Sequence, residues 1–137
     1  MPTATAPDGA SIVYEVAGDG LPMVLVHGIT ESRGSWEPLI APLARQHWVV
    51  TVDLRGHGES DRCTPYDVLT MAADVHAVVE ATGVRGPLVV GHSLGGAVVS
   101  VYAAANPVRG VVNVDQPLEL SRLPGTAQTA RTRAARR

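Results

Sequence analysis

Gly91-His92-Ser93-Leu94-Gly95-Gly96 matches the pattern G-x-S-x-G and lies between a short apolar segment, residues 88–90, and a segment of helical apolar spacing that ends at Asn106-Pro107. A strand before and a helix after are the context in which this pattern places a serine on a sharp, strained turn. Side chains two residues either side of the serine would collide with such a turn, so Gly91 and Gly95 supply the missing Cβ atoms. We therefore predict a strand-turn-helix unit with Ser93 at its bend.

The predicted place of Ser93 gives its hydroxyl group a chemical use. At the head of a helix, the Leu94 backbone N–H and the helix dipole can meet a negative charge that develops on a bound substrate. The alternative interpretation is an ordinary strand-to-helix turn in which Ser93 only caps the helix.

Strands and helices alternate on both sides of this turn. Short, β-branched and mostly apolar segments predict parallel strands buried on both faces, at residues 23–26, 48–52, 88–90 and 111–114. Residues 11–17 predict an outer strand. Two further helices are predicted, one at residues 36–45 capped by Ser35 and one from a cap at Thr64 to a stop at Gly83. This order predicts an α/β fold, with an open, mostly parallel sheet flanked by helices.

The loops after the carboxyl ends of the strands are where such sheets gather functional groups. The first core strand leads into His27-Gly28-Ile29-Thr30-Glu31, and the second leads into Asp53-Leu54-Arg55-Gly56-His57-Gly58-Glu59-Ser60-Asp61. Together with the turn at Ser93, these loops resemble the N-terminal half of an α/β-hydrolase of the esterase, lipase and non-haem perhydrolase type. The resemblance covers roughly residues 10 to 118.

The resemblance implies a role for each motif. Ser93 is then the nucleophile at the nucleophile elbow, and the backbone N–H groups of Ile29 and Leu94 form the oxyanion hole. The remaining motif residues are then structural: His27, Gly28, Gly91, His92, Gly95 and Gly96 around the site, and Arg55, His57 and Asp61 in the second loop.

A serine at the nucleophile position also bears on the reaction. Relatives that open epoxides or displace halides use aspartate there, so the resemblance disfavours those activities. It implies instead attack on an ester, thioester, lactone or peracid-type carbonyl of a small molecule, through an acyl-enzyme and without a metal ion or organic cofactor.

The catalytic base is the missing part. In this fold the chain order is serine, then an acid, then histidine, but every histidine of the chain precedes Ser93: His27, His47, His57, His76 and His92. His92 is a poor base for its neighbour, because adjacent side chains on an extended turn diverge. Asp115 follows the strand predicted at residues 111–114 and is a candidate acid, with capping of the next loop as its alternative role.

Composition excludes several classes of function. The 137 residues are 45% hydrophobic and 18% charged, with a net charge of −2, so we expect a folded protein that does not bind nucleic acid. No apolar run approaches the ~20 residues of a spanning helix, and the first residues lack the features of a signal peptide. The single cysteine, Cys63, allows no internal disulfide. We expect a cytoplasmic protein without a membrane segment.

The charge of the chain changes near its end. Residues up to Leu118 hold six arginines and twelve acidic residues, whereas residues 119–137 hold five arginines and one glutamate. We expect a disordered leader at residues 1–10, a partial hydrolase domain at residues 11–118 and a basic, disordered tail at residues 119–137.

Three hypotheses explain why the chain has the motif around Ser93 but no histidine after it and a basic end. The first is a serine hydrolase truncated after the strand that follows the elbow helix, by a genuine stop or a frame shift, and poorly active as this chain. The second is a non-catalytic module of the same fold that binds a small molecule or a protein. The third is a complex in which a second chain adds strands and a histidine across the exposed edge strand, an edge that otherwise promotes aggregation.

Overall fold

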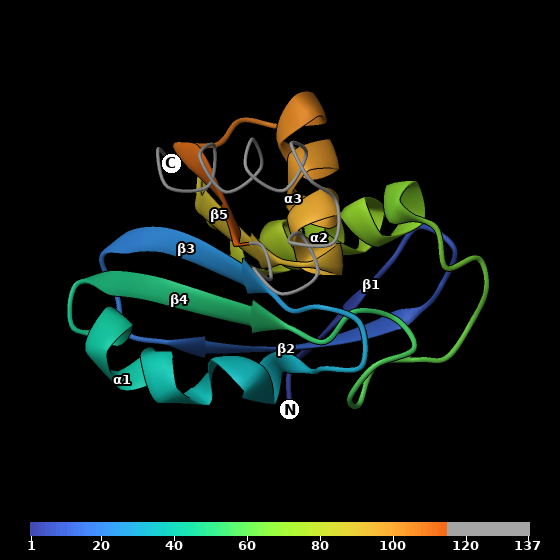
Figure 1. The fold of residues 1–137 in the computed structure, drawn as a ribbon, viewed down its shortest axis with the longest axis horizontal. Helices are drawn as coiled ribbons and strands as arrows, with labels where there is room; N and C mark the ends of the chain where they lie inside the picture. The colour runs from blue at the N-terminus through green and yellow to red at the C-terminus, as the bar shows by residue number, and fades with distance from the viewer. Residues whose placement is uncertain (115–137) are drawn as a thin grey trace, which may run out of the picture.

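The computed structural model describes residues 1–114. In this part of the chain a six-stranded sheet has the order β1-β2-β4-β3-β5-β6 (Figure 1). Its strands are β1 (Thr3–Thr5), β2 (Ser11–Ala17), β3 (Leu21–Val26), β4 (His47–Val52), β5 (Leu88–His92) and β6 (Gly110–Val114). Strands β4, β3, β5 and β6 run parallel, whereas β1 and β2 pair antiparallel with their neighbours. The predicted open, mostly parallel α/β sheet is confirmed.

Helices cover both faces of the sheet. The 3-10 helix η1 (Arg33–Trp36) continues into α1 (Glu37–Ala44) on one face, and α2 (Val68–Thr82) and α3 (Leu94–Ala105) cover the other (Figure 1). Strand β3 supplies both cores, because successive residues of a strand point to opposite faces. Val24 and Val26 belong to the core on the α2 and α3 side, and Met23 and Leu25 to the core on the α1 side. No helix within residues 1–114 is both long and apolar enough to cross a membrane.

The carboxyl ends of the parallel strands meet at one edge of the sheet. Val26, the last residue of β3, pairs with Val52 of β4 and with Gly91 of β5. The loops after these three strands therefore start side by side. This register places the three motifs of the sequence at one end of the molecule.

The expectation of a disordered leader at residues 1–10 is wrong. Thr3–Thr5 forms strand β1, which pairs antiparallel with β2, so β2 is not the outer strand that we predicted. Ala4, Ala6 and Ala10 are each no more than 4% exposed. Small side chains suffice to fill this part of the core, and the ion pair between Asp8 and Arg55 adds a long-range anchor that composition does not reveal.

Two predicted helix caps are also wrong. Ser32 caps η1 by accepting a hydrogen bond from the Gly34 N–H, and α1 begins after Trp36 without a side-chain cap. The cap of α2 is Asp67, which accepts a hydrogen bond from the Thr70 N–H at 2.7 Å. The predicted caps, Ser35 and Thr64, do not fill this role. Thr64 lies outside α2, and the carbonyl groups of its neighbours Cys63 and Pro65 accept hydrogen bonds from Arg55 and not from the helix. Gly83, with φ of 78°, ends α2 as predicted.

Candidate active site

The turn at Ser93 joins β5 directly to α3. Ser93 has φ of 57° and ψ of −116°, a positive φ that a serine adopts only where the surrounding structure enforces it. Its backbone N–H donates to the Val114 carbonyl at 3.1 Å, and its own carbonyl accepts from the Gly96 N–H at 2.9 Å. The Ser93 side chain does not cap α3. The hydroxyl group is therefore not used as a helix cap, and the interpretation of Ser93 as a capping residue is wrong.

Glycines are required around this turn because other main-chain segments approach too closely. A Cβ on Gly91 would collide with the Gly95 carbonyl, and a Cβ on Gly95 would collide with the carbonyl groups of Val26 and His27. A Cβ on Gly96 would collide with the Asn113 side chain, whose amide donates to the Gly96 carbonyl at 3.4 Å. The close packing of β3, β5 and α3 thus fixes the strained turn.

The loop after β3 lies directly beside Ser93. A Cβ built on Gly28 would come within 3.1 Å of Ser93 Cβ and of the His92 carbonyl oxygen. The next residue, Ile29, is 63% exposed, and Thr30 has φ of 67°. Neither the Ile29 N–H nor the Leu94 N–H donates a hydrogen bond to another backbone group of residues 1–114. Within residues 1–114, two amide donors without a backbone acceptor therefore belong to the two segments that meet at Ser93.

His27 is held as a neutral, fully engaged ring below this loop. Its side chain is completely buried, its Nδ1 donates to the Gly28 carbonyl at 2.7 Å, and its Nε2 accepts from the Leu54 N–H at 3.1 Å. Burial lowers the pKa of His27 and outweighs the Gly28 hydrogen bond, which acts in the opposite direction. Both ring nitrogens are occupied, so this histidine joins two loops and has no free nitrogen for proton transfer.

Glu31 and His92 form a second link across the site. Glu31 Oε1 accepts from the Gly28 N–H at 2.9 Å and lies 3.1 Å from His92 Nδ1. Burial is the largest single influence on the pKa of Glu31, and it raises this pKa. The hydrogen bonds from Gly28 and His92 lower it, and the resulting pKa lies below the usual value. The sequence analysis did not assign a role to Glu31. Its position three residues after Gly28, in a loop at the carboxyl end of a core strand, was the available signal.

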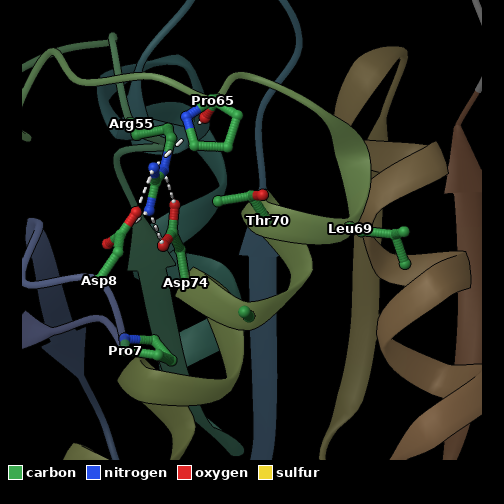
Figure 2. Close-up of a pocket in the computed structure, with 8 residues that line it drawn as sticks. Pro7, Asp8, Arg55, Pro65, Leu69, Thr70 and Asp74 are labelled. Carbon is green, nitrogen blue, oxygen red and sulfur yellow. Dashed lines mark hydrogen bonds and ion pairs between the residues drawn. The ribbon is translucent and has the colours of Figure 1, made fainter.

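The loop after β4 is built around a buried ion pair. The Arg55 guanidinium donates to both carboxylate oxygens of Asp74 on α2, at 2.6 and 2.7 Å, and to Asp8 at 2.9 and 3.1 Å (Figure 2). The hydrogen bonds that Arg55 donates to Asp74 and Asp8 raise the pKa of Arg55 above its usual value. Asp61 accepts from the Ser11 N–H at 2.8 Å, and His57 Nδ1 lies 2.9 Å from the Arg55 carbonyl. Arg55 and Asp61 thus connect distant parts of the fold, whereas His57 holds its own loop.

A cavity of about 380 Å³ adjoins the Arg55 ion pair, between the leader and α2 (Figure 2). Its lining residues are Pro7, Asp8, Arg55, Pro65, Leu69, Thr70, Ala73 and Asp74. No residue of the elbow or of the Gly28 loop lines it. The cavity therefore belongs to the packing of the leader against α2, apart from the candidate site.

The structure thus brings Ser93, Leu94, Gly28 and Ile29 together at the end of β3 and β5. Asp115, the candidate acid, lies outside the described residues. Asn113, whose amide contacts the elbow through Gly96, is a further residue that the sequence analysis did not single out.

Comparisons with known proteins agree with this geometry. A family model described as the alpha/beta hydrolase fold matches residues 22–136. A non-heme chloroperoxidase from Streptomyces lividans is 43% identical over 114 residues, covering 80% of this chain and 41% of that protein. A soluble epoxide hydrolase from Corynebacterium sp. (strain C12) is 40% identical over 100 residues, covering 72% of this chain and 35% of that protein.

The fold also resembles the folds of solved structures. The esterase RhEst1 from Rhodococcus sp. ECU1013 superposes with a TM-score of 0.77 and 43% identity, covering 82% of this chain and 44% of that structure. The chain spans about two fifths of the length of these relatives. The sequence match and the shared architecture together show that the chain belongs to the alpha/beta hydrolase fold family.

Proposed function

We propose that this chain carries the nucleophile and the oxyanion hole of a serine hydrolase that cleaves carboxylic-ester-type bonds of a small molecule. The observation that carries the proposal is the elbow itself: Ser93 is held at positive φ and its side chain does not cap α3. Strain of this kind persists where the fold over-determines it, and it is concentrated at functional sites.

Acyl transfer at this site follows from the groups that are present. Ser93 Oγ attacks the carbonyl carbon, its proton passes to a base, and the carbonyl oxygen becomes an oxyanion that the Ile29 and Leu94 N–H groups can bind. Collapse of this intermediate breaks the bond to the alcohol, which leaves with the proton and gives an acyl-enzyme. Water then attacks the acyl carbonyl, and the acid and free Ser93 are released.

The chemistry of serine argues against epoxide opening, although a soluble epoxide hydrolase is among the relatives. Attack of a serine hydroxyl on an epoxide carbon would form an ether, and water does not cleave an ether under these conditions. Attack on a carbonyl forms an ester, which water can hydrolyse. A covalent cycle through Ser93 therefore closes only with an acyl substrate.

The proposal assigns no base within the described residues. Each histidine of the chain precedes Ser93, and His27 has no free ring nitrogen. Without a triad base, hydrolases lose roughly 10⁴- to 10⁶-fold in turnover, and the oxyanion hole and substrate binding supply what remains. Asp115 stays a candidate acid. We propose that the 137-residue chain is a slow esterase at most.

The test is turnover of p-nitrophenyl acetate by the purified chain and by Ser93→Ala. The expected result is a slow hydrolysis that the substitution abolishes. Turnover near the roughly 10 per second that is typical of enzymes would show that the base is present and would contradict the slow rate. Equal hydrolysis by Ser93→Ala would contradict the role of Ser93.

A binding module of the same fold is the second candidate function, and it fits the observation that His27 has both ring nitrogens occupied and so offers no base to the elbow. In this case Ser93 would act only as a hydrogen-bond donor to a bound molecule. Hydrolysis that depends on Ser93 would exclude this candidate, because a pure binding site releases its ligand unchanged.

A further inference from the structure

One carboxylate oxygen connects the two segments of the candidate site. Glu31 Oε1 accepts from the Gly28 N–H at 2.9 Å and from His92 Nδ1 at 3.1 Å. Gly28 precedes Ile29, which carries one proposed oxyanion donor, and His92 precedes Ser93. The link therefore joins the loop of the oxyanion hole to the elbow of the nucleophile.

The loop that Glu31 closes is strained. The Glu31 N–H donates back to the Gly28 carbonyl at 3.2 Å, and Thr30 within this turn has φ of 67°. A β-branched residue at positive φ is disfavoured, so the turn needs support from outside itself. The Glu31 carboxylate supplies that support from one side and His27, which donates to the Gly28 carbonyl, supplies it from the other.

The same carboxylate also determines which amide remains free. The Gly28 N–H is occupied by Glu31, so it is unavailable to a substrate oxygen. The Ile29 N–H has no backbone acceptor among residues 1–114. Glu31 thus leaves Ile29 as the donor of this loop, at a place where donors must be held before the reaction occurs.

We propose that Glu31 is a positioning residue of the oxyanion hole, whose carboxylate holds Gly28 and His92 together and so fixes the Ile29 N–H relative to Ser93. The inference rests on the proposed function. Glu31 itself touches none of the reacting atoms.

A second His–Glu pair in the chain provides a matched comparison. His76 and Glu80 lie one turn apart on α2, with Nε2 and Oε1 at 3.4 Å, and their side chains are 45% and 72% exposed. Glu31 and His92 are 32% and 21% exposed, and they come from the loop after β3 and from the end of β5. Glu80→Ala removes the same residue type from a pair that holds no loop, and serves as the control.

The experiment uses phenylboronic acid, which binds a reactive serine at equilibrium and so does not depend on a rapid proton transfer. Ser93 Oγ forms a bond to the trigonal boron, and its proton passes to water. The tetrahedral boronate that results carries one negative charge and places an oxygen where the oxyanion would lie. Affinity is measured by NMR titration of the wild-type chain and its variants, with Ser93→Ala to locate the adduct.

The expected order of affinities follows from the geometry. Glu31→Ala and Glu31→Asp, which lack an oxygen able to span both donors, weaken binding at least about tenfold, since a lost oxyanion donor costs about 10²- to 10³-fold in rate. Glu31→Gln keeps an oxygen that accepts from Gly28 and stays within about threefold of wild type. Glu80→Ala is unchanged. The Ile29 amide signal shifts on adduct formation in the wild type and in Glu31→Gln, but not in Glu31→Ala.

Three results would overturn the inference. Wild-type affinity in Glu31→Ala and Glu31→Asp would show that the link positions nothing. Equal weakening in Glu31→Gln would show that hydrogen-bond acceptance by this side chain is not the cause. If the wild-type chain forms no adduct at Ser93, the proposed function fails and the inference fails with it, whereas an adduct that is insensitive to Glu31 refutes the inference alone.

Discussion

The elbow around Ser93 and the ion-pair cluster around Arg55 both follow strands of the same sheet, yet they treat polar groups in opposite ways. Arg55 is completely buried, and its guanidinium is satisfied by Asp74, by Asp8 and by backbone carbonyls. Ser93 is half-buried, its side chain does not cap the helix that it precedes, and the Leu94 N–H beside it has no backbone acceptor in the described part of the chain. The charged cluster around Arg55 connects parts of the fold. The turn around Ser93, within residues 1–114, leaves hydrogen-bonding groups that a ligand can use. Uncommitted donors, rather than charge, mark the candidate site.

The largest effect that this comparison predicts is on stability. Arg55→Ala leaves Asp74 buried without its partner, and breaking a buried pair in this way destabilises proteins by about 3 to 5 kcal/mol. Urea unfolding measures the change in the free energy of unfolding. Arg85→Ala, in the exposed turn before β5, is the control and should stay within about 0.5 kcal/mol of wild type. A loss below about 1 kcal/mol in Arg55→Ala would show that the cluster is not structural.

A smaller effect is expected at the elbow. Gly95→Ala places a Cβ against the Val26 and His27 carbonyl groups, which belong to a core strand and its loop and cannot easily move. Crowding of this kind costs about 1 to 3 kcal/mol and should also displace Ser93. Thermal unfolding measures the loss of stability, and boronate binding reports the displacement of Ser93.

Gly34→Ala is the matched control for the glycine at the elbow. A Cβ there would meet only the Ser32 hydroxyl oxygen, at 3.4 Å. The variant should therefore unfold and bind boronate as the wild type does. If Gly95→Ala has the same stability and the same boronate affinity as Gly34→Ala, the inference that the elbow is too tightly packed for a Cβ at Gly95 is wrong.

The smallest effect concerns pH. The hydrogen bond from Arg55 lowers the pKa of Asp8 from its ordinary value of 3.8. A carboxyl group with a lowered pKa in the folded state stabilises the protein fully above its unfolded pKa, and this contribution is lost as the pH falls through the folded pKa. Asp8→Asn should therefore be less stable than wild type at pH 6, and the difference should shrink as the pH falls below 3.8 toward the lower pKa of the folded state.

Urea unfolding at a series of pH values measures this difference. Asp19→Asn, in the exposed segment between β2 and β3, is the control for the loss of one surface carboxylate and should stay within about 0.5 kcal/mol of wild type at pH 6. A difference between Asp8→Asn and wild type that grows toward low pH would have the wrong sign and would refute the anchoring of the leader through Asp8.

The sequence predicts the core strands more accurately than the edge strand and the helix caps. Mostly apolar runs locate β3, β4, β5 and β6 to within two residues at each end, because a strand inside a parallel sheet tolerates few polar residues. The expected burial of residues 111–114 on both faces is wrong, since no residue of β6 is buried and Val114 is 39% exposed. Strand β1 escapes prediction, since Thr3–Thr5 gains its stability from pairing with β2 and not from its own composition. The true cap of α2 is Asp67, three residues after the predicted one, and the carbonyl groups of Cys63 and Pro65 before it accept hydrogen bonds from Arg55, a residue distant in sequence.

The candidate site shows the same division. Gly91, Ser93 and Gly95 could be assigned from spacing, because the steric demands of a sharp turn allow few residue types. The link from Glu31 to Gly28 and His92 could not be assigned, because it is made by a side chain across two loops that are 61 residues apart in sequence. Contacts of this kind exist only once the sheet has brought the ends of β3 and β5 together.

The most direct test of the central claim, that Ser93 is the reactive nucleophile of this chain, is to map the site of modification by a fluorophosphonate probe. The chain and Ser93→Ala are incubated with the probe for a long period, digested and analysed by mass spectrometry. The account predicts slow modification of a single peptide, with the phosphonyl group on Ser93 and none in Ser93→Ala. Modification of another residue at the same rate, or an unmodified Ser93 after complete exposure to the probe, would contradict it.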